Sequence, residues 1–248
     1  MGRQTEGKTQ GSRATPKQAF FVLMETPCPY LPGRRERKLM TEMRPPDATA
    51  AYSSLSRAGF RRSHNYAYRP ACRDCTACVP VRVRAAEFTP GRSLRRVQQA
   101  NRKLHVENLA PKATKQQFAL FSRYIHSRHG EGEMAGMNFA DYKAMVENTW
   151  LDTTLSEFRD PDGTMVAACL TDWLEDGPSA VYSFFEPSLA RNGLGNYMVL
   201  WLIEAAQGRN LPHVYLGYWI RNSVKMAYKS RFQPIEGLGP EGWKTLGA

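Results

Sequence analysis

The chain of 248 residues is long enough for one large domain or two small ones, and 42% hydrophobic and 23% charged residues are ordinary for a globular protein. No apolar run is long enough to cross a bilayer, and the polar first residues lack the apolar core of a signal peptide, so a membrane or secreted protein is not expected. We therefore expect a cytoplasmic protein whose five cysteines stay reduced and act as metal ligands or free thiols.

The net charge of +11 lies entirely in the first part of the chain. Residues 1–100 hold 19 of the 34 Lys and Arg but only 7 of the 23 Asp and Glu. Such asymmetry indicates a polyanion-binding module, with nucleic acid as the expected partner, joined to a near-neutral module. A basic surface that merely keeps the protein soluble is the alternative interpretation.

The first part is expected to form a small basic domain after a disordered polar tail at residues 1–18. Its predicted elements are, in chain order, a strand at residues 20–24, a proline-fixed turn at residues 28–33, a helix from Asp47 to Arg57, strands at residues 65–69 and 79–83, and a helix at residues 93–104. The last helix is amphipathic, because Leu94 and Val97 share an apolar side while arginines face elsewhere.

The stretch NYAYRPACRDCTACVPVRV brings thiols and arginines together. Cys72, Cys75 and Cys78 follow the pattern C-x-x-C-x-x-C, and Cys28 lies upstream in a second arginine-rich stretch. Three such thiols plus one remote Cys are a ferredoxin-like ligand spacing for an iron–sulfur cluster. Zinc on the same four residues and a metal-free thiol cluster remain open. Cys169 is most simply a buried apolar residue.

The Ala-Pro pair at residues 110–111 marks the expected boundary between a basic, cysteine-containing domain at residues 19–109 and a second domain at residues 110–248. The predicted elements of the second domain are a helix opened by a capping box of Thr114 and Gln117, a helix at residues 141–148, strands at residues 155–159, 165–173 and 179–185, a helix at residues 195–207, a strand at residues 213–219, and a last helix with Lys225, Met226, Tyr228 and Lys229.

An antiparallel meander, a glycine turn, a helix, a strand and a helix are the layout of a GNAT-like acyltransferase domain, so we expect an α+β fold with a mostly antiparallel sheet. The phosphate loop of that fold reads Q/R-x-x-G-x-G/A, so that backbone amides cradle a pyrophosphate. Aligned on Gly193 and Gly195, this chain has Ala190 at the Gln/Arg position. The loop is therefore imperfect for coenzyme A. The stretch NSVKMAYKSRF resembles the terminal A-x-x-x-Y-x-K-x-G-F pattern, with Arg231 replacing its glycine.

Several stretches together resemble one family: CPYLPGRRERKLMTEM, GFRRSHNYAYRPACRDCTACVPVRV, SLRRV, AVYSFFEPSLARNGLGNYMVLWLIEAA and VYLGYWIRNSVKMAYKSRFQP. They are similar to the aminoacyl-tRNA–protein transferases, and among these to the bacterial aspartate/glutamate leucyltransferases of the N-degron pathway, over residues 20–232. The resemblance implies a cysteine-containing N-terminal domain, a GNAT-like C-terminal domain, and transfer of leucine from leucyl-tRNA to the α-amine of proteins that begin with Asp or Glu, which marks them for degradation.

The implied chemistry is aminolysis of an activated ester, for which no cofactor is required. An α-amine with a pKa near 7.7–8.0 is partly neutral at about pH 7.2, so positioning matters more than a strong base. We expect Tyr228, in the tyrosine position of the GNAT-like pattern, to donate a proton to the leaving ribose oxygen, and Glu186 to hold the incoming amine or accept its proton. A buried core tyrosine and a carboxylate that caps the next turn are the structural alternatives.

The remaining candidate residues bind the substrates. Basic residues near the end of the chain are expected to pair with the acidic side chain of the acceptor, since Arg meets a carboxylate in bidentate fashion; they are Lys225, Lys229 and Arg231. Tyr182, Phe184 and Trp219 are candidates for an apolar leucine pocket, or else plain core. The arginines expected to contact tRNA phosphates are Arg34, Arg35, Arg37, Arg61, Arg62, Arg69, Arg82, Arg95 and Arg96.

Two other functions are compatible with parts of the sequence. An N-acetyltransferase that uses acetyl-coenzyme A would have the same fold, but Ala190 in the phosphate loop argues against it. A non-catalytic, metal-linked regulator that binds nucleic acid would account for the arginines and cysteines, but it leaves the second domain without a task.

Overall fold

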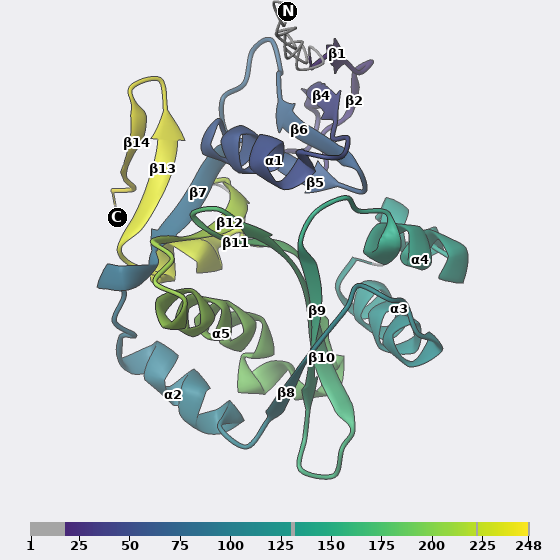
Figure 1. Ribbon diagram of the computed structural model, residues 1–248, viewed down its shortest axis with the longest axis vertical. Coiled ribbons are helices and arrows are strands. Elements are labelled where there is room, and N and C mark those ends of the chain that lie inside the picture. The colour runs from purple at the N-terminus through teal and green to yellow at the C-terminus, as the bar shows by residue number, and fades with distance from the viewer. Residues whose placement is uncertain (1–17, 130–131, 222, 248) are drawn as a thin grey trace, which may run out of the picture.

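The computed structural model describes residues 18–129, 132–221 and 223–247 (Figure 1). The strands and α-helices are, in chain order, β1 (Phe20–Val22), β2 (Thr26–Pro27), β3 (Arg35–Glu36), β4 (Lys38–Glu42), α1 (Ala48–Arg57), β5 (Arg61–Ser63), β6 (Tyr66–Pro70), β7 (Val79–Arg84), α2 (Arg92–Asn101), β8 (His105–Leu109), α3 (Lys115–His129), α4 (Phe139–Glu147), β9 (Thr153–Arg159), β10 (Met165–Leu174), β11 (Gly177–Phe185), α5 (Leu194–Gly208), β12 (His213–Trp219), β13 (Ile235–Gly239) and β14 (Gly242–Thr245). Short 3-10 helices connect them at η1 (Ala85–Glu87), η2 (Glu133–Gly136), η3 (Pro187–Asn192) and η4 (Ala227–Arg231). Within these described ranges, no helix has the length and apolar character needed to cross a bilayer.

An eight-stranded sheet forms the centre of the protein, in the order β14-β13-β7-β12-β11-β10-β9-β8. Its neighbouring strands pair antiparallel except β11 and β12, which run parallel. A smaller antiparallel sheet, β1-β4-β6-β5, lies at the upper end of the molecule in Figure 1. The predicted α+β fold with a mostly antiparallel sheet is therefore confirmed.

Tight turns fix the meander of β9, β10 and β11. Between β9 and β10, the carboxylate of Asp160 accepts hydrogen bonds from the backbone N–H of Asp162 and Thr164, and Gly163 takes a positive φ of 81°. The turn into β11 needs Gly177, because a Cβ at its φ of 148° would lie 1.8 Å from the carbonyl oxygen of His213. These turns place β11 beside β12.

Helices cover both faces of the large sheet (Figure 1). On one face α5 buries Met198, Leu202 and Ile203 against β7, β10 and β12. On the other face α3 and α4 bury Phe121 and Tyr142 against β9, β10 and β11. Because β10 is buried along its whole length, it separates these two cores.

A third core joins the small sheet to the end of the large one. It brings Tyr52 of α1 and Ala67 of β6 against Leu174 of β10 and Tyr215 of β12. Burial of apolar side chains at this junction fixes the cysteine-bearing part of the chain against the open end of β11 and β12.

Most of the predicted elements are found with ends shifted by a few residues. The capping box of α3 is confirmed, since Gln117 N donates to Thr114 Oγ1 and Thr114 N donates to Gln117 Oε1. The prediction of a last α-helix is wrong: only η4 forms, because Phe232 turns into the core and Pro234 cannot continue a helix. The hairpin of β13 and β14 that follows was not predicted.

The large sheet is assembled from both sides of the predicted boundary at residues 109 and 110. From the first part, β7 pairs with β12 and β13, and β8 pairs with β9. The division into two domains stays a prediction, but strand pairing links its two parts.

Candidate functional site

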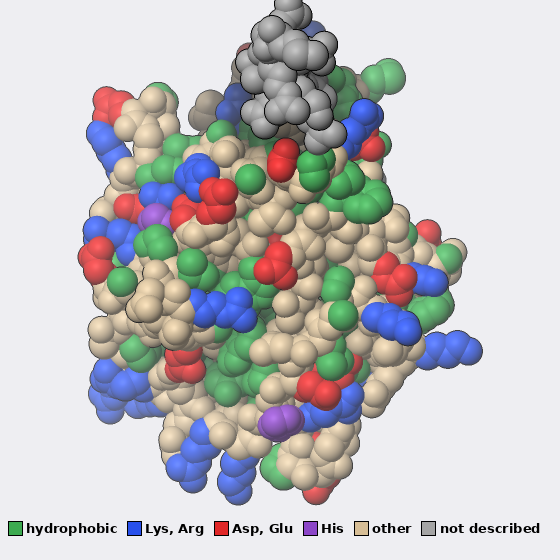
Figure 2. Space-filling model, viewed as in Figure 1, with side chains coloured by type: hydrophobic (Ala, Val, Ile, Leu, Met, Phe, Trp, Pro, Cys, Tyr) green, Lys and Arg blue, Asp and Glu red, His purple; other side chains and the backbone are tan. Residues whose placement is uncertain are grey.

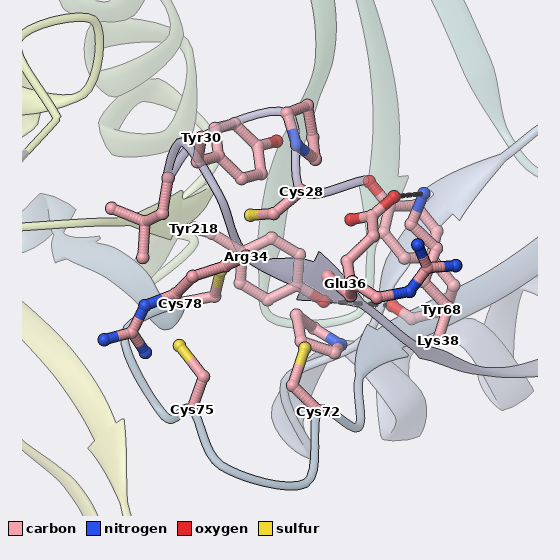
Figure 3. Close-up of a pocket in the computed structure, with 14 residues that line it drawn as sticks. Cys28, Tyr30, Arg34, Glu36, Lys38, Tyr68, Cys72, Cys75, Cys78 and Tyr218 are labelled. Atoms are coloured by element: carbon pink, nitrogen blue, oxygen red, sulfur yellow. Dashed lines mark hydrogen bonds and ion pairs between the residues drawn. The ribbon is translucent and has the colours of Figure 1, made fainter. Parts of the chain in front are cut away.

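Four thiols surround one pocket between the small sheet and β7 (Figure 3). Cys28, Cys72, Cys75 and Cys78 are free and half-buried. Burial, and next the three neighbouring thiols, raise the pKa of Cys78 to about 12, which reflects how closely the sulfur atoms gather. Among the described residues, however, no three His, Cys, Asp or Glu side chains form a ready coordination site. Four thiols are suitable ligands for iron or zinc, but the described side chains are not close enough together to form a complete coordination site.

Backbone contacts bring the two thiol segments together. Cys28 N donates to the carbonyl of Arg34 at 2.8 Å, which closes the turn between β2 and β3. Arg37 then binds the start of the second segment: its Nε donates to Ala71 O at 2.9 Å, and Ala71 N donates to Arg37 O at 2.7 Å. Cys72 follows directly, so the turn with Cys28 faces the loop between β6 and β7.

Beside this pocket, Arg61 lies between β11 and β12. These strands share only one registered pair, Ser179 with Tyr215. Further along, Arg61 Nη2 donates to the carbonyl oxygens of Ala180 at 3.4 Å and Val181 at 3.2 Å. On the opposite strand Arg61 packs against Gly217, where a Cβ would lie 2.4 Å from Arg61 Cζ. Arg61 thus donates to backbone carbonyls of β11 that the amides of a neighbouring strand would otherwise satisfy.

Lys229 lies on the same side of β12 and is buried. Its Nζ donates to the carbonyl oxygen of Tyr218 at 2.5 Å. Burial, and next the charge of Arg61, hold the pKa of Lys229 well below its usual value. The hydroxyl of Tyr218 is within hydrogen-bond distance of Gly59 O and Tyr68 O, at 3.1 and 3.0 Å. Lys229 is therefore buried against β12, and its pairing with the acidic side chain of the acceptor stays a prediction.

Tyr228 precedes Lys229 in η4 and is partly exposed. Its side chain keeps 37% of its surface exposed, its ring packs edge-on against Phe232, and Lys229 Nζ lies 5.9 Å from the ring centroid. Desolvation raises the pKa of Tyr228 to about 12. The hydroxyl therefore stays protonated at neutral pH, which is the state needed of a proton donor.

Glu186 is committed to neighbouring groups. Its carboxylate accepts hydrogen bonds from Arg123 Nε at 3.0 Å and from Ser188 N and Oγ, and caps η3. Burial alone would raise the pKa of Glu186, but the bonds from Ser188 and Arg123 outweigh it and lower the pKa. The carboxylate is thus ionised and forms the capping contact that was the structural alternative in the sequence.

The aromatic residues predicted to form a leucine pocket are not brought together. Phe184 is buried and Tyr182 half-buried in the core under α3 and α4, both next to Phe121. Trp219 packs into the other core, under α5. Its indole Nε1 is buried and has no hydrogen-bond partner among the described residues. The prediction of one pocket lined by all three is therefore wrong.

The predicted RNA-binding arginines divide into distinct groups. The exposed ones are Arg34, Arg35, Arg69, Arg95 and Arg96. Arg37 and Arg82 are half-buried, and Arg82 pairs with Glu236 at 2.8 Å. The assignment of Arg62 is wrong, because its side chain has no exposed surface and pairs with Asp172 at 2.7 Å.

The exposed arginines lie at opposite ends of the molecule. Arg34, Arg35 and Arg69 belong to the upper end in Figure 1, whereas α2 with Arg95 and Arg96 lies at the lower end. Figure 2 shows basic side chains gathered along this lower edge as well. Lys225 and Arg231 are exposed near Tyr228 and have no acidic partner among the described residues.

The sequence-based predictions did not distinguish Arg61, which bonds to carbonyls of β11, from Arg62, which pairs with Asp172. A signal was present, since successive side chains of a strand point to opposite faces and the two could not both meet RNA. No pattern in the sequence pointed to Gly217 or Tyr218, whose roles follow from the approach of distant segments.

Comparison with known proteins matches most of the chain. Residues 26–96 match the family described as "Arginine-tRNA-protein transferase, N terminus" and residues 116–239 match "Arginine-tRNA-protein transferase, C terminus". A protein of Paramagnetospirillum magneticum named aspartate/glutamate leucyltransferase is 54% identical over 227 residues, which is 92% of this chain and 93% of that protein. Proteins of the same name from Rhodospirillum rubrum and Rhizobium etli are 53% and 44% identical, over 90% and 95% of this chain and 92% and 95% of theirs.

Solved structures overlap with part of the chain. L-PGS from Bacillus licheniformis has a TM-score of 0.48 at 13% identity, covering 65% of this chain and 58% of its own. FemX has a TM-score of 0.46 at 10% identity, covering 77% and 65%.

Proposed function

Because this chain belongs to the arginine-tRNA-protein transferase family, we propose that it transfers leucine from leucyl-tRNA to the N-terminal α-amine of proteins that begin with Asp or Glu, marking them for degradation. The observation that carries this proposal is the 54% identity over 92% of the chain to a protein named aspartate/glutamate leucyltransferase. The partners are therefore an aminoacyl-tRNA and a protein with a free, acidic N-terminus.

The reaction joins an amine to an ester that is already activated. The α-amine attacks the carbonyl carbon of the leucyl ester, the bond to the ribose oxygen breaks, and the leaving oxygen takes up a proton. Because part of any α-amine is neutral at about pH 7.2, the enzyme has chiefly to bring amine and ester together. Tyr228 supports the last step, since its hydroxyl stays protonated and its side chain is partly exposed.

The other proposed residues hold substrates. Lys225 and Arg231, exposed on either side of Tyr228, are placed to meet an incoming chain or the RNA. Glu186 has a weaker case as a base, because its ionised carboxylate already serves Arg123 and Ser188. Phe184 and Tyr182 remain candidates for contact with leucine as walls of one core, without Trp219.

The four thiols are proposed to hold an iron–sulfur cluster or a zinc ion. Cys28, Cys72, Cys75 and Cys78 supply the sulfur ligands that both prefer. A bound metal would cross-link the turn at Cys28 to the loop between β6 and β7. The transfer chemistry itself needs no such group.

The test supplies radiolabelled leucyl-tRNA together with a peptide that begins with Asp. The expected result is a labelled peptide, and no label on the same peptide with an acetylated N-terminus. If label passes instead from acetyl-coenzyme A to the peptide, the protein is an acetyltransferase. If leucyl-tRNA binds but no donor gives transfer, the non-catalytic regulator is the better interpretation.

A further inference from the structure

We propose that Arg61 selects the acceptor: where β11 and β12 continue beyond their one registered pair, its guanidinium receives the side-chain carboxylate of the N-terminal Asp or Glu. This inference rests on the proposed function and reassigns Arg61 from tRNA contact to acceptor specificity.

The first argument is the geometry of the guanidinium. A guanidinium carries five N–H donors in a planar fork that matches a carboxylate. Arg61 uses one nitrogen, Nη2, for the carbonyls of Ala180 and Val181. Its other nitrogens make no hydrogen bond to any described residue, and Arg61 as a whole is half-buried. The anchored edge fixes the fork, and the remaining donors are left for a ligand.

The second argument is an unbalanced charge. Arg61 and Lys229 lie close together, yet neither has an acidic partner among the residues the structure describes. Arg61 contacts uncharged groups instead: its Cζ lies 5.9 Å from the ring centroid of Tyr218, and the guanidinium packs against Gly217. Enclosing the permanently charged guanidinium of Arg61 without a counter-charge is costly, so an anion that binds here is strongly favoured.

The neighbouring residue supplies an internal comparison. Arg62 is also enclosed, and the chain provides its counter-ion, Asp172, at 2.7 Å. Arg61 points to the other face of β5 and receives no such partner from the described chain. We therefore infer that the substrate brings the missing carboxylate.

The third argument is proximity to the proposed chemistry. Lys229 Nζ lies 5.9 Å from the ring centroid of Tyr228 and donates to Tyr218 O, and Arg61 Cζ lies 5.9 Å from the ring centroid of Tyr218, so the three side chains gather at the end of β12. In an N-terminal Asp or Glu, the carboxylate and the α-amine belong to the same residue. A carboxylate held by Arg61 thus keeps the reacting amine near Tyr228, where the ribose oxygen leaves.

The test compares leucine transfer to peptides that begin with Asp or with the neutral isostere Asn. In the wild-type protein kcat/KM should favour Asp strongly. In Arg61→Gln the Asp/Asn ratio should fall by at least about 30-fold, because one partner of an enclosed charge pair is removed. The matched control is Arg44→Gln, the same change at an exposed arginine paired with Glu42, and its ratio should stay at the wild-type value.

An equal loss of rate with both peptides would overturn the proposal and indicate that Arg61 stabilises the reacting ester or the fold. If Arg61→Gln does not fold, Arg61→Lys decides, since it keeps the charge but loses the fork: a several-fold lower ratio supports the proposal and an unchanged ratio refutes it. Failure of the wild-type protein to transfer leucine to any peptide would instead count against the proposed function.

Discussion

Arg62 and Asp172 form an ion pair in which neither side chain has any exposed surface, with Arg62 Nε 2.7 Å from Asp172 Oδ2. The other oxygen of Asp172 accepts from Thr153 at 2.7 Å, and Arg62 Nη1 donates to His64 O at 3.0 Å. The pair joins β5 of the small sheet to β10 of the large one. The two sheets are therefore held together by a fully enclosed charge pair.

Asp172→Asn should lower the free energy of unfolding by about 3–5 kcal/mol, because it leaves the charge of Arg62 enclosed without a partner. Urea unfolding followed by circular dichroism measures the loss. Lys143→Gln, which removes an exposed pair with Glu147, is the control and should cost about 0.5 kcal/mol or less. Similar losses in the two variants would show that the enclosed pair contributes no more to the free energy of unfolding than an exposed pair.

Tyr228→Phe should lower kcat for leucine transfer by about 100-fold or more, since a positioned proton donor contributes on this order. Binding of leucyl-tRNA should change little. Because the pKa of Tyr228 is raised to about 12, the wild-type rate should not fall through loss of this proton below about pH 11. Tyr197→Phe is the control, because it removes the hydroxyl of a tyrosine on α5 whose ring packs against Phe158. Unchanged turnover in Tyr228→Phe would exclude it from the chemistry.

Because the pKa of Lys229 is lowered in the folded protein, the free energy of unfolding should increase towards alkaline pH. Its pKa is held well below 10.5 in the folded protein, so between that lowered value and 10.5 the unfolded chain binds more protons. The free energy of unfolding therefore rises with pH across this window. Relative to Lys229→Met, the wild-type protein should gain stability as the pH rises towards 10.5.

The measurement for Lys229 is urea unfolding of both proteins at several pH values. Lys225→Met, at an exposed position, is the control and should keep a constant difference from the wild type. A constant difference for Lys229→Met as well would mean that this amine titrates alike in the folded and unfolded chain.

The two groups of exposed arginines should differ in their effect on tRNA binding. Arg34 and Arg35 line the pocket of the four thiols, whereas Arg95 and Arg96 lie on α2. The double change Arg34→Gln and Arg35→Gln should weaken leucyl-tRNA binding and lower the salt dependence of log K by about 0.7–0.9 for each phosphate that the variant no longer neutralises. The corresponding double change on α2 should have a smaller effect, and the reverse order would place the acceptor end of the RNA at α2.

Anaerobically purified protein should contain iron and sulfide and absorb visible light, because four thiols with ferredoxin-like spacing surround one pocket. Cys75→Ser should abolish the absorption, and Cys169→Ala, a buried thiol in β10, should preserve it. Elemental analysis that finds zinc in place of iron would correct the metal, and protein free of both would leave a thiol cluster.

Local patterns in the sequence were sufficient for the elements whose signals are local. The apolar segments of β9, β10 and β11 between turn residues and the capping box at Thr114 are each visible within a few residues, and the structure contains them. The segment after β12 could not be predicted in this way. Its helical spacing is overridden because Phe232 is needed in the core beside Phe88.

The candidate site was less accessible to sequence reasoning, because it depends on long-range placement. Charge alone could not separate Arg61, wedged between strands, from Arg62, paired with Asp172, or from Arg34 at the surface. The prediction of one leucine pocket lined by aromatic residues of β11 and β12 is wrong for a similar reason. Their side chains enter different cores, and the sequence does not show which core each strand faces.

The position of β7 has a consequence for any attempt to divide this chain. It runs inside the sheet with β12 on one side and β13 on the other, so the later residues depend on an earlier strand to satisfy their backbone groups. A fragment that begins at residue 110 would lose both β7 and β8, which leaves β12, β13 and β9 with unpaired amides and carbonyls, and such edges are templates for aggregation. Supplied as separate polypeptides, the halves would have to find each other before either became stable.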